Sequence, residues 1–252
     1  MQKNVFCTVE YVGTNYFGFQ LQNKKGKSEP TVQEFIETAL KKLFKKDIRI
    51  IYASRTDRGV HAKEQVINFK IDTNIPLKNI KKALNSFLPK DIYVRKIKTV
   101  PLNFHSRFCA KSKIYRYVIF NRNQPSVFYR NFSWHIDRPL DIKKMKEAVS
   151  FLIGKKDFSI FAKDVKNYKD CTREIKNIWI KKQNSFIYID IEADGFLRNM
   201  ARNIVGFLVK VGEGKIKISD IVYILEKKLK YINKPAPSCG LYLRKVKYSY
   251  DL

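Results

Sequence analysis

The spacing of apolar residues between positions 32 and 44 constrains the fold of this 252-residue chain more than any other feature. The apolar residues recur at intervals of three and four: Val32, Phe35, Ile36, Ala39, Leu40, Leu43 and Phe44. This spacing places them on one face of a helix, which must pack against another element. Thr31 and Glu34 form a capping box at its start. We therefore predict a core helix over 32–44.

The segments around this helix give the first half of the chain the order β-α-β-β-α-β. Strand patterns cover about residues 5–12, 47–54, 64–71 and 91–98, and a second helix runs from Pro76 to about Phe87. The second half repeats a similar order. Its strands are expected at about 107–120, 173–181, 185–193 and 241–249, and its helices at about 141–152, from 197, and at 219–229.

This order predicts an α+β fold built from two ferredoxin-like halves. We assign residues 1–103 to the N-terminal half and residues 104–252 to the C-terminal half. An edge strand from each half is expected to join one mixed, mainly antiparallel sheet flanked by helices. A central basic cleft between the halves is then the expected place for a ligand.

The charge of the chain indicates a polyanionic partner. Lys and Arg number 51 against 23 Asp and Glu, which gives a formal net charge of +28 at pH 7. This excess suits phosphate backbones, although a ribosomal or membrane-surface protein would also carry it. No apolar run approaches the roughly 18 residues of a membrane-spanning helix. The N-terminus enters a strand pattern without a signal peptide, so we expect a cytoplasmic protein.

The cysteines and histidines do not form a metal-binding pattern. The chain has four cysteines and three histidines, widely separated and without a Cys-x-x-Cys pair. Zinc ribbons and thiol redox sites need such close spacing. We therefore predict no metal in the chemistry and interpret the cysteines as structural.

A single carboxylate, Asp57, lies between Arg55 and Arg58 in the segment Ser-Arg-Thr-Asp-Arg-Gly-Val-His-Ala, residues 54–62. A carboxylate among cations stays ionised at neutral pH, and the cations attract a polyanion. An ordinary turn is the alternative, because Asp and Gly favour turns and Gly59 can supply a positive φ. We interpret Asp57 as a candidate for chemistry on nucleic acid.

The segment 196–206 predicts a helix with two different faces. Its polar arc comprises Arg198, Asn199, Arg202, Asn203 and Gly206. A solvated surface is the ordinary interpretation of such an arc. Asn and Gly disfavour helices, however, so their presence beside two arginines suggests close approach of another backbone or a ligand. An arginine here could brace a buried carboxylate.

Basic and aromatic residues alternate between positions 104 and 117. The segment Phe104-His105-Ser106-Arg107-Phe108 is followed by Tyr115-Arg116-Tyr117 on a strand. Aromatic rings stack on bases and arginines hold phosphates, which makes this a candidate RNA surface. Packing of the tyrosines in a core is the alternative, and the sequence does not decide between the two.

Taken together, these segments resemble the tRNA pseudouridine synthase A (TruA) family in matching order over nearly the whole chain. The resemblance includes the opening segment 11–20, the helix start 31–34 and the Asp57 segment 55–62. Further similar segments are 107–108 with 115–117, 157–161, 195–206 and 240–243. Val12 and Phe19 depart from the family pattern, which usually has Asp and Trp there, so the contribution of residues 12–22 is left open.

The resemblance implies conversion of uridine to pseudouridine on the 3′ side of the tRNA anticodon arm, at position 38, 39 or 40, without a cofactor. It implies Asp57 as nucleophile or charge stabiliser and Arg202 as its salt-bridge partner. Tyr115 would stack on the flipped uracil, and Arg55 would promote the flipping. Asp57 could attack the uracil or ribose C1′, or the reaction could pass through a glycal after Tyr115 or Asp57 takes the 2′ proton. We favour the glycal route.

Other residues complete the expected site and its partners. Arg58, His61 and Leu241 are expected to contact the substrate, although a leucine in a strand is more often core. The expected RNA contacts are Phe104, His105, Ser106, Arg107, Phe108, Lys169, Arg173 and Arg198. A homodimer that holds tRNA across both subunits is also implied. The alternative function is a noncatalytic RNA chaperone or ribosome-associated protein.

Overall fold

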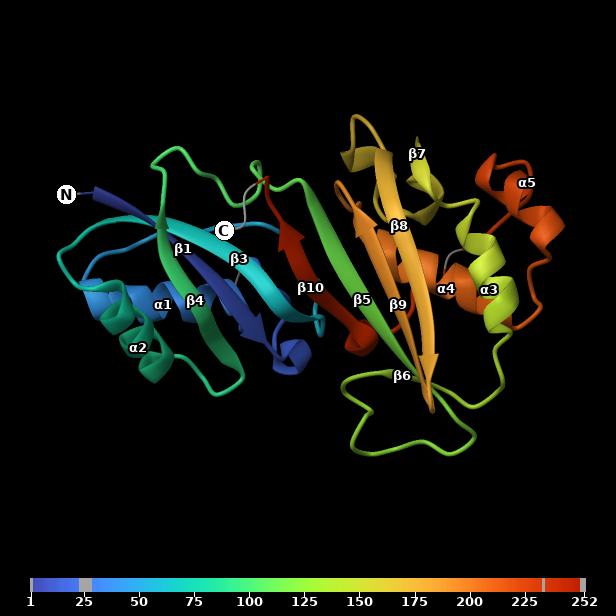
Figure 1. Cartoon of the computed structure of the whole chain (residues 1–252), viewed down its shortest axis with the longest axis horizontal. Coiled ribbons are helices and arrows are strands. Elements are labelled where there is room, and N and C mark those ends of the chain that lie inside the picture. Colours follow the sequence, from blue (N-terminus) through green and yellow to red (C-terminus); the bar gives the residue numbers. More distant parts are fainter. Residues whose placement is uncertain (1, 23–28, 233, 250–252) are drawn as a thin grey trace. The chain divides into compact units, whose positions relative to one another are not determined.

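The computed structural model describes residues 2–22, 29–232 and 234–249. The chain divides into two compact units, Met1–Lys111 with Tyr242–Leu252, and Ser112–Leu241. Both units contain strands and helices (Figure 1). No helix in the described part of the chain has the length and apolar character needed to cross a membrane.

The strands of the first unit follow the order β4-β1-β3-β10, and β2 pairs with β3. Their bounds are β1 Gln2–Tyr11, β2 Ile51–Tyr52, β3 His61–Asp72, β4 Ile92–Val100 and β10 Leu241–Lys247. β1 pairs antiparallel with β3 and β4, whereas β10 pairs parallel with β3. From β1 to β4 the elements follow the predicted order β-α-β-β-α-β, and β10 joins them from the C-terminal part of the chain.

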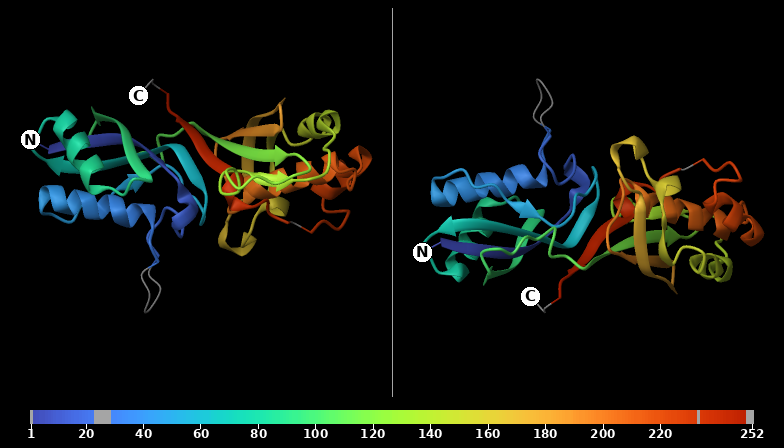
Figure 2. Two further views of the ribbon diagram at one scale, coloured as in Figure 1. Left: turned by 90° about the horizontal axis from the view of Figure 1, so that it is seen from below. Right: turned by 90° about the horizontal axis from the view of Figure 1, so that it is seen from above.

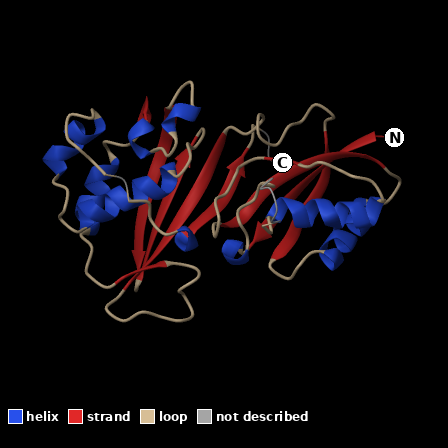
Figure 3. Cartoon of the chain, turned by 180° about the vertical axis from the view of Figure 1, so that it is seen from behind, coloured by secondary structure: helices blue, strands red, loops and turns tan. Residues whose placement is uncertain are grey.

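Two helices belong to the first unit, α1 (Val32–Phe44) and α2 (Leu77–Phe87). α1 lies against one face of the strands, and α2 contacts α1 and β4 (Figures 1 and 3). The Thr31 hydroxyl accepts a hydrogen bond from the Glu34 backbone N–H at 3.3 Å, as the predicted cap requires. Ile36 and Leu40 of α1 are fully buried. The predicted helix is thus confirmed with its bounds.

The strands of the second unit follow the order β5-β9-β8-β7, and β6 pairs parallel with β5. Their bounds are β5 Ser112–Asn121, β6 Trp134–Ile136, β7 Gly154–Asp157, β8 Thr172–Gln183 and β9 Phe186–Ala193. The helices are α3 Ile142–Val149, α4 Met200–Gly212 and α5 Ile221–Leu225. The helices gather on one side of these strands, as the two turned views show (Figure 2).

The architecture is α+β with mixed, mainly antiparallel pairing, as predicted. Two short strands, β6 and β7, were not predicted, because neither is long enough to show an alternating pattern. The helix expected from residue 197 begins at Met200, since Asn199 has a left-handed backbone with φ of 62°. Arg198 and Asn199 are therefore not on its polar face. The functional division at 103/104 stays a prediction.

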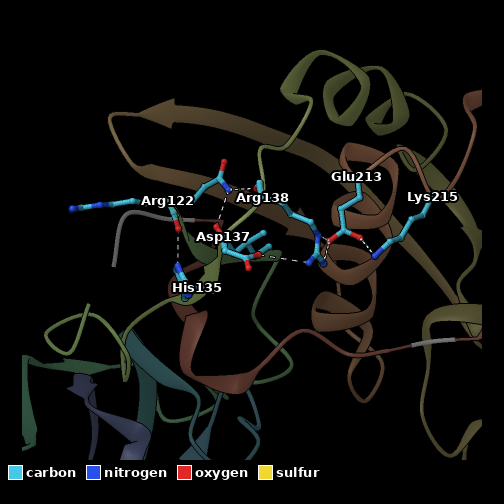
Figure 4. A network of polar contacts seen from close by, with 8 residues as sticks. Arg122, His135, Asp137, Arg138, Glu213 and Lys215 are labelled. Carbon is cyan, nitrogen blue, oxygen red and sulfur yellow. Dashed lines mark hydrogen bonds and ion pairs between the residues drawn. The ribbon is translucent and has the colours of Figure 1, made fainter. Parts of the chain in front are cut away.

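An ion-pair network joins the end of α4 to the segment after β6 (Figure 4). The Glu213 carboxylate accepts from Arg138 Nε at 2.8 Å and lies 2.7 Å from Lys215 Nζ. The Glu213 side chain is only 4% exposed. Burial alone would raise the pKa of Glu213, but the hydrogen bonds from Lys215 and Arg138 outweigh it and lower the pKa.

This lowered pKa predicts a defined acid dependence of stability. A carboxyl whose pKa is lower in the folded chain stabilises it above its ordinary pKa of 4.5, and that contribution disappears as the pH falls through the folded value. We expect Glu213→Gln to lower the free energy of unfolding at pH 7 by about 1–3 kcal/mol and to flatten its decline towards pH 3. Calorimetry at both pH values measures this. Glu226→Gln, which removes an exposed pair with Lys228, is the control, and an equal effect of the two variants would contradict the expectation.

Candidate active site and RNA interface

The loop that carries Asp57 is fixed at its start by buried side chains. Gln65 of β3 accepts from the Ser54 backbone N–H at 3.2 Å and donates to the Ser54 carbonyl at 2.6 Å. The Thr56 hydroxyl lies 2.8 Å from the Tyr11 hydroxyl, and both side chains are buried. The residue before Asp57 is thereby held to β1, which limits the motion of the loop.

Asp57 itself is half-buried and opens a tight turn. The Val60 backbone N–H donates to the Asp57 carbonyl at 3.1 Å, and Gly59 has a φ of 75°. This is the turn that the Asp and Gly pattern predicted. Arg55 and Arg58, on either side of Asp57, are both exposed.

The opening segment, residues 11–20, packs against this loop through two glycines. A Cβ on Gly13 would lie 2.0 Å from the Val60 carbonyl oxygen, and one on Gly18 would lie 2.7 Å from the Thr56 carbonyl oxygen. Gly18 also has a φ of +103°. Only glycine allows so close an approach of two backbones. The contribution of this segment, left open by the sequence, is to support the Asp57 loop.

The two departures from the family pattern occupy structural positions. Phe19 is fully buried, and its ring centre lies 4.8 Å from that of Tyr52. The Val12 backbone N–H donates to the Asp91 carbonyl at 2.9 Å. Phe19 therefore fills the core beside the loop.

The candidate substrate residues around Asp57 differ in exposure. His61 is 1% exposed, its Nδ1 accepts from the Gly13 backbone N–H at 3.0 Å, and its ring stacks on Tyr242 at 4.7 Å. The Arg58 guanidinium lies 4.0 Å from the centre of the Phe17 ring. His61 thus also helps to anchor the opening segment, a contact that the sequence did not indicate.

In the second unit, the two tyrosines of β5 have different contacts. Tyr115 is 5% exposed, and its ring meets that of Phe196 edge to face at 4.8 Å. Tyr117 is fully buried, and its hydroxyl donates to the Pro237 carbonyl at 2.8 Å. Tyr117 is therefore a core residue with a satisfied hydroxyl. Leu241, at the start of β10, is 6% exposed.

Arg116, on the opposite face of β5, forms an ion pair that the sequence did not indicate. Its Nε and Nη2 donate to the two carboxylate oxygens of Asp190 at 2.8 and 2.7 Å. The hydrogen bond to Asp190 raises the pKa of Arg116. The guanidinium also lies 5.2 Å from the Tyr188 ring centre. This bidentate pair orients the guanidinium within the unit.

Arg202 lies on the first turns of α4 and is half-buried. Its Nε donates to the Ala236 carbonyl at 2.6 Å, and the Ala236 backbone N–H donates to the Arg202 carbonyl at 3.1 Å. A Cβ on Gly206 would lie 2.4 Å from the Lys234 carbonyl oxygen. The close backbone approach suggested for this glycine is therefore present.

Asn203 shows that the polar face of α4 is not a solvated surface. Its side chain is 3% exposed, and its Nδ2 donates to the Phe161 carbonyl at 2.7 Å. Asn203 thus ties α4 to the short 3₁₀ turn η2 (Ser159–Phe161).

The candidate RNA segment 104–108 presents its members unequally. Phe108 is 75% exposed, and Arg107 is exposed beside it. The His105 and Phe108 rings stack at 4.2 Å, and His105 Nδ1 accepts from the backbone N–H groups of Arg107 and Phe108 at 3.2 and 3.3 Å. Ser106 is fully buried. Arg107 and Phe108 are therefore the members most accessible to a ligand.

Three further RNA candidates lie in the second unit. Lys169 is exposed, and Arg173 donates through Nη1 to the Thr172 carbonyl at 2.5 Å. Arg198 forms an ion pair with Asp164 and remains 54% exposed. The Arg198 backbone N–H donates to the Tyr168 hydroxyl at 2.9 Å.

Comparison with known proteins identifies the family. The family model for tRNA pseudouridine synthase matches residues 8–109 and 148–249, which include Asp57 and Arg202 but not Tyr115. The chain therefore belongs to the tRNA pseudouridine synthase family, a class of isomerases.

Within this family, the chain is similar to proteins named tRNA pseudouridine synthase A, which agrees with the TruA resemblance. A tRNA pseudouridine synthase A of Thermoanaerobacter sp. (strain X514) is 47% identical over 247 residues, covering 98% of this chain and all of the relative. A tRNA pseudouridine synthase A 2 of Clostridium tetani (strain Massachusetts / E88) is 44% identical over 250 residues, covering 99% and 100%.

Proposed function

We propose that this chain converts uridine to pseudouridine on the 3′ side of the anticodon arm of tRNA, at position 38, 39 or 40. The observation that carries the proposal is the Asp57 loop, in which a carboxylate flanked by Arg55 and Arg58 stands on a backbone held by Tyr11, Gln65 and the opening segment. Family membership and the names of the relatives support the same activity. The activity needs no cofactor.

The reaction is an isomerisation, so uridine and pseudouridine have the same atomic composition. The bond between N1 and ribose C1′ breaks, the uracil rotates, and a bond forms between C5 and C1′. The C5 proton leaves to solvent, and N1 gains a proton. Catalysis must therefore supply a group that acts at the ribose or the base, together with a pocket that holds the detached ring.

We assign Asp57 as the nucleophile or charge stabiliser, because only an ionised carboxylate serves either purpose. Arg202 is assigned as its salt-bridge partner, and its Nε bond to Ala236 fixes the direction of the guanidinium. Tyr115 is assigned to stack on the uracil. In the glycal route, which we favour, Tyr115 or Asp57 takes the 2′ proton.

The target base must leave its stack to reach Asp57, at a cost of a few kcal/mol. We assign Arg55 to promote this flipping, since it is exposed and precedes Asp57 by two residues. Arg58, His61 and Leu241 are proposed to contact the substrate. Because His61 is buried, we propose that it acts on the substrate indirectly, through the residues that it contacts.

The remaining tRNA is proposed to bind along basic and aromatic side chains. Arg107 and Phe108 combine a phosphate-binding cation with an exposed ring, and Lys169, Arg173 and Arg198 add positive charge in the second unit. The net charge of +28 favours the association. A homodimer that shares one tRNA, acting in the cytoplasm, completes the proposal.

Mapping of the modified position tests this function. An unmodified tRNA transcript with uridine at 38, 39 and 40 is incubated with the protein, and pseudouridine is located by carbodiimide labelling and primer extension. We expect stops in this region alone, which disappear when the three uridines are changed to cytidine. Modification confined to another arm of the tRNA would contradict the proposed site.

Arg107 provides a separate prediction for RNA binding. We expect Arg107→Gln to weaken tRNA binding and to reduce the slope of log affinity against log salt by about one, because one phosphate contact is lost. Filter binding at four salt concentrations measures the slope. Arg95→Gln is the matched control, since Arg95 lies in the same unit and is already paired with Glu10. Equal slopes for Arg107→Gln and wild type would contradict the assignment.

A further inference from the structure

Two asparagines are buried on neighbouring strands of the first unit. Asn4 of β1 is 1% exposed and Asn68 of β3 is 0% exposed. Asn68 lies opposite Phe6 in the antiparallel register, so it is diagonal to Asn4 on the same face. A buried amide is costly unless its donors and acceptors are paired. The partners of these two amides therefore indicate what they do.

The partners lie in the segment between β4 and β5. Asn4 Nδ2 donates to the carbonyls of Pro101 at 2.9 Å and Phe104 at 3.0 Å. Asn68 Nδ2 donates to Asn4 Oδ1 at 3.0 Å and to the Phe104 carbonyl at 3.3 Å. Asn68 Oδ1 accepts from the Ser106 backbone N–H at 2.9 Å. All four N–H bonds of the two amides are used.

A tyrosine from the C-terminal part of the unit completes this network. The Tyr248 hydroxyl donates to the Ser106 carbonyl at 2.7 Å. The Tyr248 ring lies 5.3 Å from that of Phe104, which lies 5.8 Å from that of Phe6. Burial raises the pKa of Tyr248, so its hydroxyl remains a donor. Both polar groups of the Ser106 backbone are therefore held by side chains from other elements.

The fixed backbone leads directly to exposed groups. Arg107 and Phe108 follow Ser106, and their backbone N–H groups donate to His105 Nδ1. Phe108 is 75% exposed, whereas Ser106 is fully buried. A segment without helix or strand thus has a defined conformation at the point where it presents a cation and a ring.

We propose that Asn4 and Asn68 are positioning residues for RNA binding, whose amides hold residues 101–106 so that Arg107 and Phe108 face the tRNA. This inference rests on the RNA-binding role proposed above for the segment 104–108. It gives a function to polar groups that a purely structural core would fill with apolar side chains. The same strand, β3, begins directly after the Asp57 loop, so one strand positions both segments.

Asn68→Leu tests the proposal, because leucine has a similar volume and none of the bonds. We expect the KM for tRNA to rise about tenfold with kcat within about twofold, since binding is lost without change at Asp57. Arg107→Ala should weaken binding less in the Asn68→Leu background than in wild type, because both act through one segment. Asn85→Leu is the matched control. The Asn85 side chain hydrogen-bonds the backbone N–H and carbonyl of Val94, which lies outside residues 101–106. The KM of Asn85→Leu for tRNA should therefore stay unchanged.

Hydrogen exchange separates positioning from general destabilisation. The Ser106 amide should exchange faster in Asn68→Leu while amides of α1 keep their protection. If Asn68→Leu does not fold, Tyr248→Phe removes only the bond to the Ser106 carbonyl and should raise KM about threefold. An unchanged KM in a folded variant with a fast Ser106 amide would overturn the proposal. If wild type binds tRNA without making pseudouridine, the proposed function fails, and the affinities of the same variants still decide the positioning.

Discussion

Replacing Asp57 with alanine is expected to abolish pseudouridine formation while tRNA affinity is kept or rises. Turnover should fall by about 10⁴-fold or more, because Asp57 is the single carboxylate in the segment 54–62. Loss of a negative charge cannot weaken attraction to phosphate. Single-turnover rates and filter binding on the same preparation measure both quantities. Asp57→Asn, which keeps the shape of the side chain, should behave in the same way.

The matched control is Asp47→Ala, which removes one negative charge from the same unit at an 85% exposed side chain paired with Lys41. It should leave turnover unchanged within about twofold. Retained turnover in Asp57→Ala would refute the assigned role. A fall in affinity equal to the fall in turnover would instead indicate that the residue only shapes the RNA site.

Gly13→Ala is expected to lower turnover by displacing the Asp57 loop, although Gly13 itself is not assigned to the catalytic site. The new Cβ would lie 2.0 Å from the Val60 carbonyl oxygen, so the opening segment and the Asp57 loop must separate. We expect turnover to fall by about 100-fold, because a shift of about 1 Å at a catalytic group has an effect of that size. The free energy of unfolding should fall by about 1–3 kcal/mol. Single-turnover rates and thermal unfolding measure the two effects.

Gly214→Ala is the control for this prediction. Gly214 has a φ of +73° and no atom within 4 Å of an added Cβ, so alanine adds backbone strain without a clash. It should lower stability by about 1 kcal/mol and leave turnover unchanged. If Gly13→Ala loses stability but not turnover, the opening segment does not position Asp57.

The sequence predicted those parts of the fold that a periodic pattern encodes. The stripe from Val32 to Phe44 and its Thr31 cap appear in the structure with the predicted bounds. β7, with the sequence Gly-Lys-Lys-Asp, has no apolar alternation, so only its pairing with β8 makes it a strand. α4 begins later than predicted because Asn199 has a left-handed backbone, and the spacing of apolar residues gives no sign of such a conformation.

The residues of the candidate site were chosen from the sequence, and their functional roles stay predictions, whereas the sequence did not indicate their contacts. The arginines around Asp57 and Gly206 of α4 were chosen as candidates from residue type alone. The approach of Gly13 to Val60, and the bonds of Asn68 to Phe104 and Ser106, join segments far apart in the chain. Such contacts depend on how strands and loops that are distant in sequence come together, which residue types and periodic patterns do not reveal.

Tritium release from tRNA labelled with [5-³H]uridine tests the central claim most directly, because formation of the new carbon bond expels the C5 proton. Wild type and Asp57→Ala are compared side by side on unmodified tRNA with uridines in the anticodon arm. The proposed function predicts release by wild type and none by Asp57→Ala, with both proteins binding the tRNA. Tight binding by wild type without release would contradict it and favour a noncatalytic RNA chaperone.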